Sequence, residues 1–385
     1  MALLKVKLNR NLRRSILRGH PWVFKEAVTA PASARAALCR VVDVKGDLAW
    51  AMYDPHGAFA LRILSTDKSA PTNEFYEQRF ARALRLRANV RSERTNAFRL
   101  FNGEGDLLPG LVCDIYDQIA VLQFDGQGPS EFWDRKLVSD WLLANAGVTS
   151  VVEKTRRSQD RTTEHIAGLE SESEITIKEH GALFKVNIEK GQKTGFFLDQ
   201  RENRQYVRET SRGKSVLNLF SYTGGFSIYA GLGGARRVAS LDIAKGAIQL
   251  AEENWVLNGL AKGAHEGLCV DVFEYLRGDT EMWDHIIVDP PSMSHSESGK
   301  EMAKAKYIEV FAAAAKRVTE NGELSLSSCS SHITFDDFLA IIEESLSQAR
   351  RNGRVLRVSG QGPDHPFPHA NLELRYLKFV HLALD

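Results

Sequence analysis

The chain has 385 residues, 26% of them charged and 43% hydrophobic, which suffices for two or three domains with separate cores. Its formal net charge of +1 identifies no partner by itself. The four cysteines form no C-x-x-C pair, which argues against a zinc or redox motif, and no metal is expected.

Two further patterns narrow the class of protein. No apolar run approaches the roughly 18 to 20 residues that a membrane helix needs. Few cysteines and the lack of a secretory leader pattern favour the reducing cytoplasm. We therefore expect a cytoplasmic protein with no membrane partner.

Two basic stretches lie in the first hundred residues. The first has no acidic residue between positions 1 and 18, and its basic residues are Lys5, Lys7, Arg10, Arg13, Arg14 and Arg18. The second runs from Arg79 to Arg99, with Glu93 as its acidic residue. Each alone would most simply be a solvated face, but the two together favour a polyanionic partner, nucleic acid first. Arg13, Arg14 and Arg18 are the candidates for RNA contact.

Residues 1–70 form the first predicted domain, which is small and rich in β-structure. Short apolar runs alternate there with turn signals at residues 45–47 and 54–57. We expect the aromatic residues of His20-Pro-Trp-Val-Phe24 in the core rather than stacked on bases.

Residues 71–180 form a second, mixed α/β domain. Thr72 can cap a helix that runs to about Val90. We expect turns over residues 99–112, a hairpin over 113–124, a helix over 132–146, strands over 151–153 and 174–178, and a loop over 154–164.

Strands and helices alternate from residue 181 to residue 385. This alternation is typical of a doubly wound, mostly parallel sheet, so the predicted fold class is α/β. Strands are expected at 183–188, 216–220, 237–242, 267–270, 285–288, 324–328, 354–358 and 373–384, and helices at 202–209, 226–232, 244–258, 272–276, 302–319 and 335–349.

The first segment whose pattern indicates a ligand-binding site is residues 216–225, Val-Leu-Asn-Leu-Phe-Ser-Tyr-Thr-Gly-Gly. A short apolar strand gives way to a glycine turn and a helix, the arrangement with which an open α/β sheet offers a cofactor to its carboxyl edge. The spacing G-x-G-x-x-G is absent, so a dehydrogenase with a nicotinamide or flavin cofactor is disfavoured.

Aspartates close three successive strands after this turn. Asp242 follows Gly224 by 18 residues, which suits the ribose hydroxyls of an adenosine. Asp271 is placed to accept from the adenine amino group, and Asp289 ends the next strand. A single aspartate at a strand end is most simply a cap, but three in succession after a glycine turn indicate a binding site.

Asp289 is followed by Pro290, Pro291 and Ser292. Two prolines fix the backbone and remove two donors, so the segment leaves the sheet rigidly and presents its carbonyls and the carboxylate. This arrangement suits a flat polar edge such as a base, and we expect residues 290–292 to contact it.

The motifs resemble those of class I S-adenosylmethionine-dependent methyltransferases. The segment Lys193-Thr-Gly-Phe-Phe-Leu-Asp-Gln-Arg201 is similar to the RlmI-like branch, whose members methylate large-subunit ribosomal RNA. The resemblance covers essentially the whole chain. It implies a PUA-type RNA-binding β-barrel over residues 1–70, a central α/β domain over 71–180, a Rossmann-like methyltransferase domain over 181–385, and a possible homodimer.

The resemblance also implies S-adenosyl-L-methionine as cofactor and 23S ribosomal RNA as partner. The residues that it points to for cofactor binding are Thr194, Phe197, Asp199, Gln200, Asn218, Phe220, Tyr222, Gly224, Asp242, Asp271 and Asp289.

Cys329 lies among serines where a strand runs into a loop, 40 residues after Asp289. By itself it would most simply be a small buried residue. In the RlmI-like pattern this position carries the nucleophile of enzymes that form 5-methylcytosine. A thiolate that adds to cytosine C6 makes C5 nucleophilic, and Asp289 would stabilise the charge that develops on the ring. The resemblance thus implies Cys329 and Asp289 as catalytic residues.

Two alternatives stay open. The RlmK-like guanine-N7 enzymes have similar motifs, need no nucleophilic cysteine and resemble this chain somewhat at residues 294–300. The other alternative is a PUA-bearing RNA-binding protein whose methyltransferase fold is inactive. Ser292 stands where a different 5-methylcytosine branch has a cysteine, and the base that removes the C5 proton is unassigned.

Overall fold

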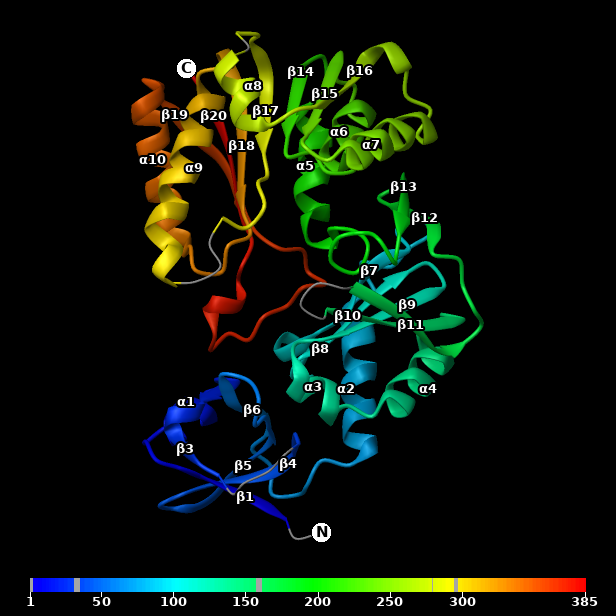
Figure 1. Cartoon of the computed structure of the whole chain (residues 1–385), viewed down its shortest axis with the longest axis vertical. Helices are drawn as coiled ribbons and strands as arrows, with labels where there is room; N and C mark the ends of the chain where they lie inside the picture. Colours follow the sequence, from blue (N-terminus) through cyan, green and yellow to red (C-terminus); the bar gives the residue numbers. More distant parts are fainter. Residues whose placement is uncertain (1–2, 31–34, 157–160, 279, 294–296) are drawn as a thin grey trace. The chain divides into compact units, whose positions relative to one another are not determined.

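The computed structural model describes residues 3–30, 35–156, 161–278, 280–293 and 297–385 (Figure 1). Its contacts divide the chain into two compact units. The first consists of Met1–Ile177, Val186–Leu198 and Pro363–Leu374, and the second of Lys178–Lys185, Asp199–Gly362 and Arg375–Asp385. Among the described residues, no helix is long and apolar enough to cross a membrane.

The first unit begins with a six-stranded, nearly closed sheet. In the order β2-β6-β5-β4-β1-β3, its strands are Trp22–Phe24, Phe59–Ser65, Gly46–Tyr53, Ala37–Asp43, Leu4–Leu8 and Val28–Thr29. Helix α1 (Arg13–Leu17) follows β1. Val6, Val41 and Leu61 are fully buried in one core, as one face of each strand must be in such a sheet. The predicted β-rich module is confirmed.

A five-stranded sheet and three helices follow in the same unit. In the order β11-β10-β9-β8-β7, the strands are Arg161–Gly168, Ser150–Arg156, Ile119–Phe124, Leu111–Tyr116 and Ala97–Asn102, and α2, α3 and α4 are Asn73–Leu86, Gln127–Phe132 and Arg135–Asn145. The Thr72 hydroxyl accepts a hydrogen bond from the Phe75 amide at 3.4 Å, so the predicted start of the first helix is confirmed.

Local predictions between residues 97 and 164 are partly wrong. The expected turn region 99–112 begins inside strand β7, and the expected loop 154–164 holds the ends of β10 and β11, where Lys154 pairs with Thr163. The Lys154 ammonium is buried and donates to the carbonyls of Ile188 and Gly191 at 2.6 and 2.8 Å. Because these distant carbonyls satisfy its charge, a polar side chain fits inside a strand here.

The helix expected over residues 132–146 is confirmed as α4, which begins three residues later than predicted, at Arg135. The Asp134 side chain accepts from the amides of Lys136 and Leu137, and this cap starts α4 anew after α3 has ended at Phe132.

The second unit is built on a seven-stranded sheet. In the order β16-β15-β14-β17-β18-β20-β19, its strands are His265–Cys269, Arg237–Asp242, Ser215–Leu219, Trp283–Val288, Val318–Ser328, Lys378–Leu384 and Gly353–Ser359. Strands β14 to β18 are parallel, and β20 is antiparallel to both of its neighbours. The predicted doubly wound, mostly parallel sheet is confirmed. A separate two-stranded sheet consists of β12 (Glu174–Glu179) and β13 (Ala182–Asn187).

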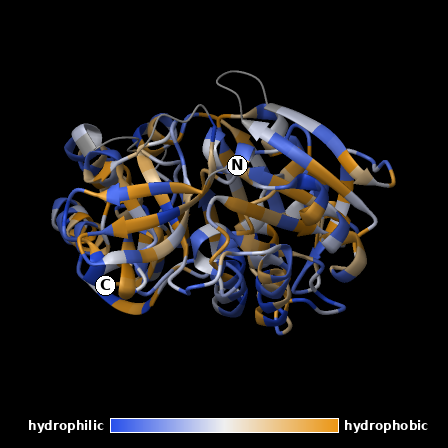
Figure 2. Ribbon diagram, turned by 90° about the horizontal axis from the view of Figure 1, so that it is seen from below, coloured by the Kyte–Doolittle hydropathy of each residue, from blue (hydrophilic) through white to orange (hydrophobic). Residues whose placement is uncertain are grey.

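Helices pack against the seven-stranded sheet. Helices α8 (Val272–Gly278), α9 (Lys300–Ala315) and α10 (Phe335–Ala349) share an apolar core with the sheet, and α9 and α10 lie side by side in Figure 1. The other helices described in this unit are α5 (Arg201–Thr210), α6 (Gly225–Leu232) and α7 (Lys245–Leu257). Hydrophobic and hydrophilic segments alternate along many strands and helices in Figure 2, as elements with one buried face require.

The helix expected over residues 302–319 ends early. Helix α9 ends at Ala315, and Val318 already pairs with Trp283 of the neighbouring strand. Helix-forming residues continued the predicted pattern, but strand pairing decides where the helix stops.

Candidate active site

The turn after β14 has an unusual backbone. Phe220 and Tyr222 have positive φ angles of 58° and 47°, although neither is glycine, and Gly224 has a φ of 80°. A Cβ at Gly224 would lie 2.9 Å from the Cβ of Ala251, so only glycine fits. Each non-glycine residue in this region costs on the order of 1–3 kcal/mol, and such strain concentrates at ligand sites. Three predicted cofactor residues thus share one strained turn.

Asp242 connects this turn to the end of β15. Its Oδ2 accepts from the Tyr222 amide at 2.9 Å and its Oδ1 from the Ala244 amide at 2.9 Å. The carboxylate is partly exposed at the carboxyl edge of the sheet. The structure therefore brings Asp242, Tyr222 and Gly224 into one neighbourhood.

Asn218 and Asp271 have structural partners. The buried Asn218 amide donates to Ser227 Oγ of α6 at 2.9 Å, which ties the strand to the helix. Asp271 accepts from the Glu274 amide at 3.0 Å and so caps α8. The simplest interpretation of a strand-end aspartate thus applies to Asp271, whose side chain remains partly exposed.

A hydrogen-bond network surrounds Asp289 at the end of β17. Gln200 Nε2 donates to Asp289 Oδ1 at 3.0 Å and to Ser327 Oγ at 3.3 Å, and Gln200 Oε1 accepts from Asn203. The buried Asp199 accepts from the Tyr376 hydroxyl at 2.6 Å. Gln200 and Asp289 therefore meet, whereas the Asp199 carboxylate is bound to Tyr376.

The loops after β17 and β18 are joined. Ser292 Oγ lies 3.1 Å from Ser330 Oγ, which also accepts from the Met293 amide. Since β17 and β18 are parallel neighbours, with Val288 opposite Leu326, both loops leave the same sheet edge. Cys329 is one residue beyond β18, so it and Asp289 end adjacent strands.

Cys329 differs from the other cysteines. Cys39 and Cys113 are buried, and burial raises the pKa of the Cys39 thiol to about 12 and that of Cys113 well above its ordinary value. Cys269 is exposed, and Cys329 is half-buried at the carboxyl edge of the sheet. A reactive thiol must be reachable, which Cys39 and Cys113 are not.

Lys378 is a neighbour of Cys329 that the sequence did not reveal. Its ammonium donates to the carbonyls of Ser330, Ile333 and Tyr376 at 2.7, 2.8 and 2.8 Å. Burial lowers the pKa of Lys378 to about 8, and negative charge at Cys329 acts in the opposite direction. The available signal is a lysine at the start of the apolar run 378–384, a pattern that by itself predicts only a strand.

Thr194 and Phe197 belong to the first unit. The Thr194 hydroxyl is buried between Asp114 Oδ2 at 2.5 Å and the Tyr116 hydroxyl at 2.8 Å. The Lys193 ammonium lies 4.4 Å from the centre of the Phe197 ring. The role of Thr194 and Phe197 toward the cofactor stays a prediction.

The three candidate RNA arginines differ in environment. Arg13 forms two hydrogen bonds with Asp43, at 2.7 and 2.8 Å. Arg14 and Arg18 are exposed and line an open cavity with His20 and His369. Their side chains are available to a polyanion, whereas that of Arg13 is engaged.

The residues that carry the guanine-N7 resemblance are only partly described, since residues 294–296 lie outside the described part of the chain. Pro290 is buried, Pro291 is exposed and Ser292 is half-buried.

Comparison with known proteins adds a family context to this geometry. A family model described as S-adenosylmethionine-dependent methyltransferase matches residues 128–363, and a PUA-like domain matches residues 6–66. The chain is 33% identical to a ribosomal RNA large subunit methyltransferase of Deinococcus radiodurans, over 99% of this chain and 98% of that protein. It is also 33% identical to a ribosomal RNA large subunit methyltransferase I of Alteromonas mediterranea, over 97% of each chain.

Solved structures agree in fold. A putative methyltransferase of Streptococcus mutans is similar with a TM-score of 0.87 and 24% identity, over 99% of this chain and 100% of that chain. A putative methyltransferase complexed with SAH also has a TM-score of 0.87 at 24% identity, over 100% of both chains.

Proposed function

We propose that this chain, which belongs to the S-adenosylmethionine-dependent methyltransferase family, forms 5-methylcytosine in large-subunit ribosomal RNA through a covalent adduct of Cys329. The observation that carries the proposal is the position of Cys329: half-buried, one residue beyond β18, beside the strand that ends in Asp289. The Lys378 ammonium is bound to the next carbonyl, that of Ser330, and a nearby cation favours a thiolate.

The proposed reaction begins with addition to the cytosine ring and ends with release of the cysteine. The Cys329 thiolate adds to C6 of the cytosine, and the electron pair of the C5–C6 bond moves toward C5 and the ring. Asp289, held by Gln200, shares a proton with N3 and limits the negative charge on the ring. When bound, the cofactor would supply an electrophilic sulfonium methyl group to C5, and the electron pair of the broken S–CH3 bond would stay on its sulfur. Loss of the C5 proton then breaks the S–C6 bond and restores both the aromatic ring and the thiolate.

A trapping experiment tests the covalent step. RNA that contains 5-fluorocytidine should form a stable adduct with the unaltered protein and the cofactor, because fluorine at C5 cannot leave as a proton does. Cys329→Ala should form none, while Cys269→Ala, which removes the exposed cysteine of the same unit, should form as much as the unaltered protein. Normal methylation by Cys329→Ala would exclude the cytosine-C5 reaction and favour guanine N7.

S-adenosyl-L-methionine is the cofactor of the family, and the residues after β14 fit it. Gly224 lets the backbone approach a ligand, and Asp242 offers a partly exposed carboxylate at the strand end where ribose hydroxyls bind in such sheets. Loss of a charged hydrogen bond is worth about 1.5–3 kcal/mol, so Asp242→Ala should weaken cofactor binding roughly tenfold to a hundredfold by calorimetry.

The control for this experiment is Asp336→Ala, which removes an exposed carboxylate of α10 in the same unit. It should leave the cofactor affinity unchanged. If the unaltered protein bound no cofactor, the inactive RNA-binding alternative would replace the enzyme.

Two observations support ribosomal RNA as the substrate. The curated relatives that align over nearly the whole chain are named as ribosomal RNA large subunit methyltransferases. The PUA-like region, residues 6–66, also carries the exposed Arg14 and Arg18. Mass spectrometry of nucleosides, applied to ribosomal RNA from cells with and without the gene, identifies the methylated product directly.

The family resemblance supports the remaining parts of the proposal. A homodimer, a cytoplasmic location where ribosomes are assembled, and the three-domain division at residues 70 and 180 all stay predictions. Light scattering of the purified protein would measure its mass in solution and so test the dimer.

A further inference from the structure

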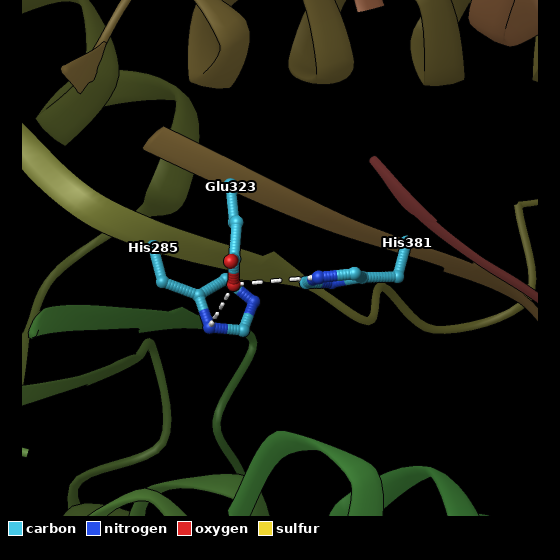
Figure 3. A group of neighbouring side chains, drawn as sticks. All are labelled: His285, Glu323 and His381. Carbon is cyan, nitrogen blue, oxygen red and sulfur yellow. Dashed lines mark ion pairs between the residues drawn. The ribbon is translucent and has the colours of Figure 1, made fainter. Parts of the chain in front are cut away.

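Three side chains of the second unit converge on the polar face of the seven-stranded sheet. His285, Glu323 and His381 come from the neighbouring strands β17, β18 and β20, and they point toward one another (Figure 3). His285 lies opposite Glu323 in the β17–β18 register, and both histidines are fully buried. The Glu323 side chain is 17% exposed.

The atoms that face one another lack hydrogen bonds. Within the described residues, His285 Nδ1, Glu323 Oε2 and His381 Nε2 are buried and have no hydrogen-bond partner. Glu323 Oε2 lies 3.3 Å from His381 Nε2 and 4.0 Å from His285 Nδ1, in neither case with hydrogen-bond geometry. A buried polar atom without a partner costs about 1–3 kcal/mol, so three together point to a missing ligand.

The outer nitrogens of both histidines are already held. Ser325 Oγ lies 2.8 Å from His285 Nε2 and 2.8 Å from His381 Nδ1. A hydroxyl oxygen has two lone pairs and can accept from both N–H groups, which leaves the lone pairs of His285 Nδ1 and His381 Nε2 directed at Glu323. A metal-ligating histidine usually has its second N–H fixed in this way.

Charge in the cluster also suits a cation. Both imidazoles are fully buried, where a neutral ring is favoured over a charged one, and the Glu323 side chain supplies the carboxylate. The Lys214 ammonium is paired with Glu323 Oε1 at 2.5 Å, which leaves Oε2 for a second partner. Neutral imidazoles and a carboxylate are the ligands that zinc-class ions prefer.

We propose that His285, Glu323 and His381 bind one divalent transition-metal ion of the zinc class as a structural site. The three ligand atoms lie within 4.8 Å of one another. Ligand bonds of about 2.0–2.2 Å in tetrahedral geometry place two ligand atoms roughly 3.4 Å apart, so binding draws the side chains together by up to about 1.4 Å. A water would complete the tetrahedron.

The site lies inside the sheet rather than at its reactive edge. His285 precedes Asp289 by four positions on β17, and at about 3.3 Å per residue this places the ion on the order of 13 Å from that carboxylate. The ion would therefore fasten β17, β18 and β20 together and take no part in methyl transfer. The spacing of the cysteines gives no sign of this metal site, because its ligands are two histidines and a glutamate that lie 38 and 58 positions apart along the chain.

The test uses the full chain, stripped with a chelator and titrated with Zn²⁺ and separately with Co²⁺. We expect one equivalent of zinc by elemental analysis, the visible absorption of tetrahedral Co²⁺, and a rise in melting temperature on adding Zn²⁺. Glu323→Gln and His381→Gln should each lose the Co²⁺ spectrum and the melting shift. Ser325→Ala keeps all three ligands and should weaken binding by about tenfold to a hundredfold.

The matched control is His265→Gln on β16. His265 is half-buried and also lies 2.8 Å from a serine oxygen, Ser240 Oγ, but it is outside the cluster. This variant should bind Co²⁺ like the unaltered protein. The proposal is overturned if the folded, unaltered chain takes up no zinc and no Co²⁺, or if Glu323→Gln, folded by circular dichroism, binds as the control does.

Discussion

The two arginine-rich stretches of the first unit have similar composition, but some of their arginines lie in opposite environments. On α1 and in the turn after it, Arg14 and Arg18 are exposed beside an open cavity. Between residues 79 and 99, Arg87 is fully buried and Arg99 is bound to Asp114 at 2.7 Å. The second stretch was expected to help attract a polyanion, and for Arg87 and Arg99 that expectation is wrong. A run of positive charge is therefore not by itself a binding face.

The partners of the buried arginines explain the difference. The Arg87 guanidinium donates to both oxygens of Asp106, at 2.5 and 2.6 Å, and to the carbonyls of Arg99 and Asp364. Arg79 donates to the carbonyls of Leu64 and Leu107. Arg79 and Arg87 thus connect neighbouring loops and strands to α2 and to its C-terminal end. Because their guanidinium groups are bound to a carboxylate or to backbone carbonyls, their charge is not available to a polyanion.

The largest effect on stability is expected from loss of the buried ion pair between Arg87 and Asp106. Arg87→Ala leaves the Asp106 carboxylate buried without its cation, and we expect the free energy of unfolding to fall by about 3–5 kcal/mol in urea titrations. Arg85→Ala, which changes an exposed residue in the last turn of α2, should change the free energy of unfolding by less than about 0.5 kcal/mol.

A double variant sharpens this contrast. Replacing the pair together, as Arg87→Met with Asp106→Leu, removes both charges, so most of the loss should be recovered. Equal losses in Arg87→Ala and Arg85→Ala would contradict the assignment of Arg87 to the core.

The sequence predicted the architecture of the second unit better than that of residues 97–164. Regular alternation of apolar strands and helices left one arrangement for the sheet, and α10 begins and ends at the predicted residues, 335 and 349. Lys154 misled the prediction because its partners, the Ile188 and Gly191 carbonyls, are more than thirty positions away. Local pattern cannot show that a charge will be satisfied at such a distance.

The same contrast between local and distant signals holds for the residues of the candidate site. Asp242 and Asp289 were found because strand ends and glycine turns are local signals. Lys378 was missed because its relation to Cys329 depends on β20 pairing antiparallel with β18, where Ser328 lies opposite Lys378. Asp271 matched a local pattern that serves equally well to cap a helix.

The exposed arginines should act on binding rather than on folding. If Arg14 and Arg18 contact RNA phosphates, the double variant Arg14→Ala, Arg18→Ala should weaken RNA binding, and each lost contact should reduce the slope of log affinity against log salt by about 0.7–0.9. Stability should stay nearly constant, since neither side chain is buried. Filter-binding assays at several salt concentrations measure the slope. An unchanged slope would remove both residues from the RNA interface.

The smallest expected effect is a change in the pKa of Asp43, which distinguishes Arg13 from Arg14 on the same helix. The Arg13 guanidinium holds the pKa of the Asp43 carboxyl at about 2, and a hydrogen bond from the Lys45 amide contributes. Because this pKa is depressed in the folded state, the stabilisation is present above the ordinary value of 3.8 and is lost as the pH falls through about 2. In Arg13→Ala the pKa of Asp43 should rise toward its ordinary value without reaching it, since the Lys45 amide remains. In Arg14→Ala it should stay near 2, because Arg13 and not Arg14 pairs with Asp43. A carboxyl-carbon NMR titration of both variants decides this, and equal pKa values in the two would mean that Arg13 is as free for RNA as Arg14.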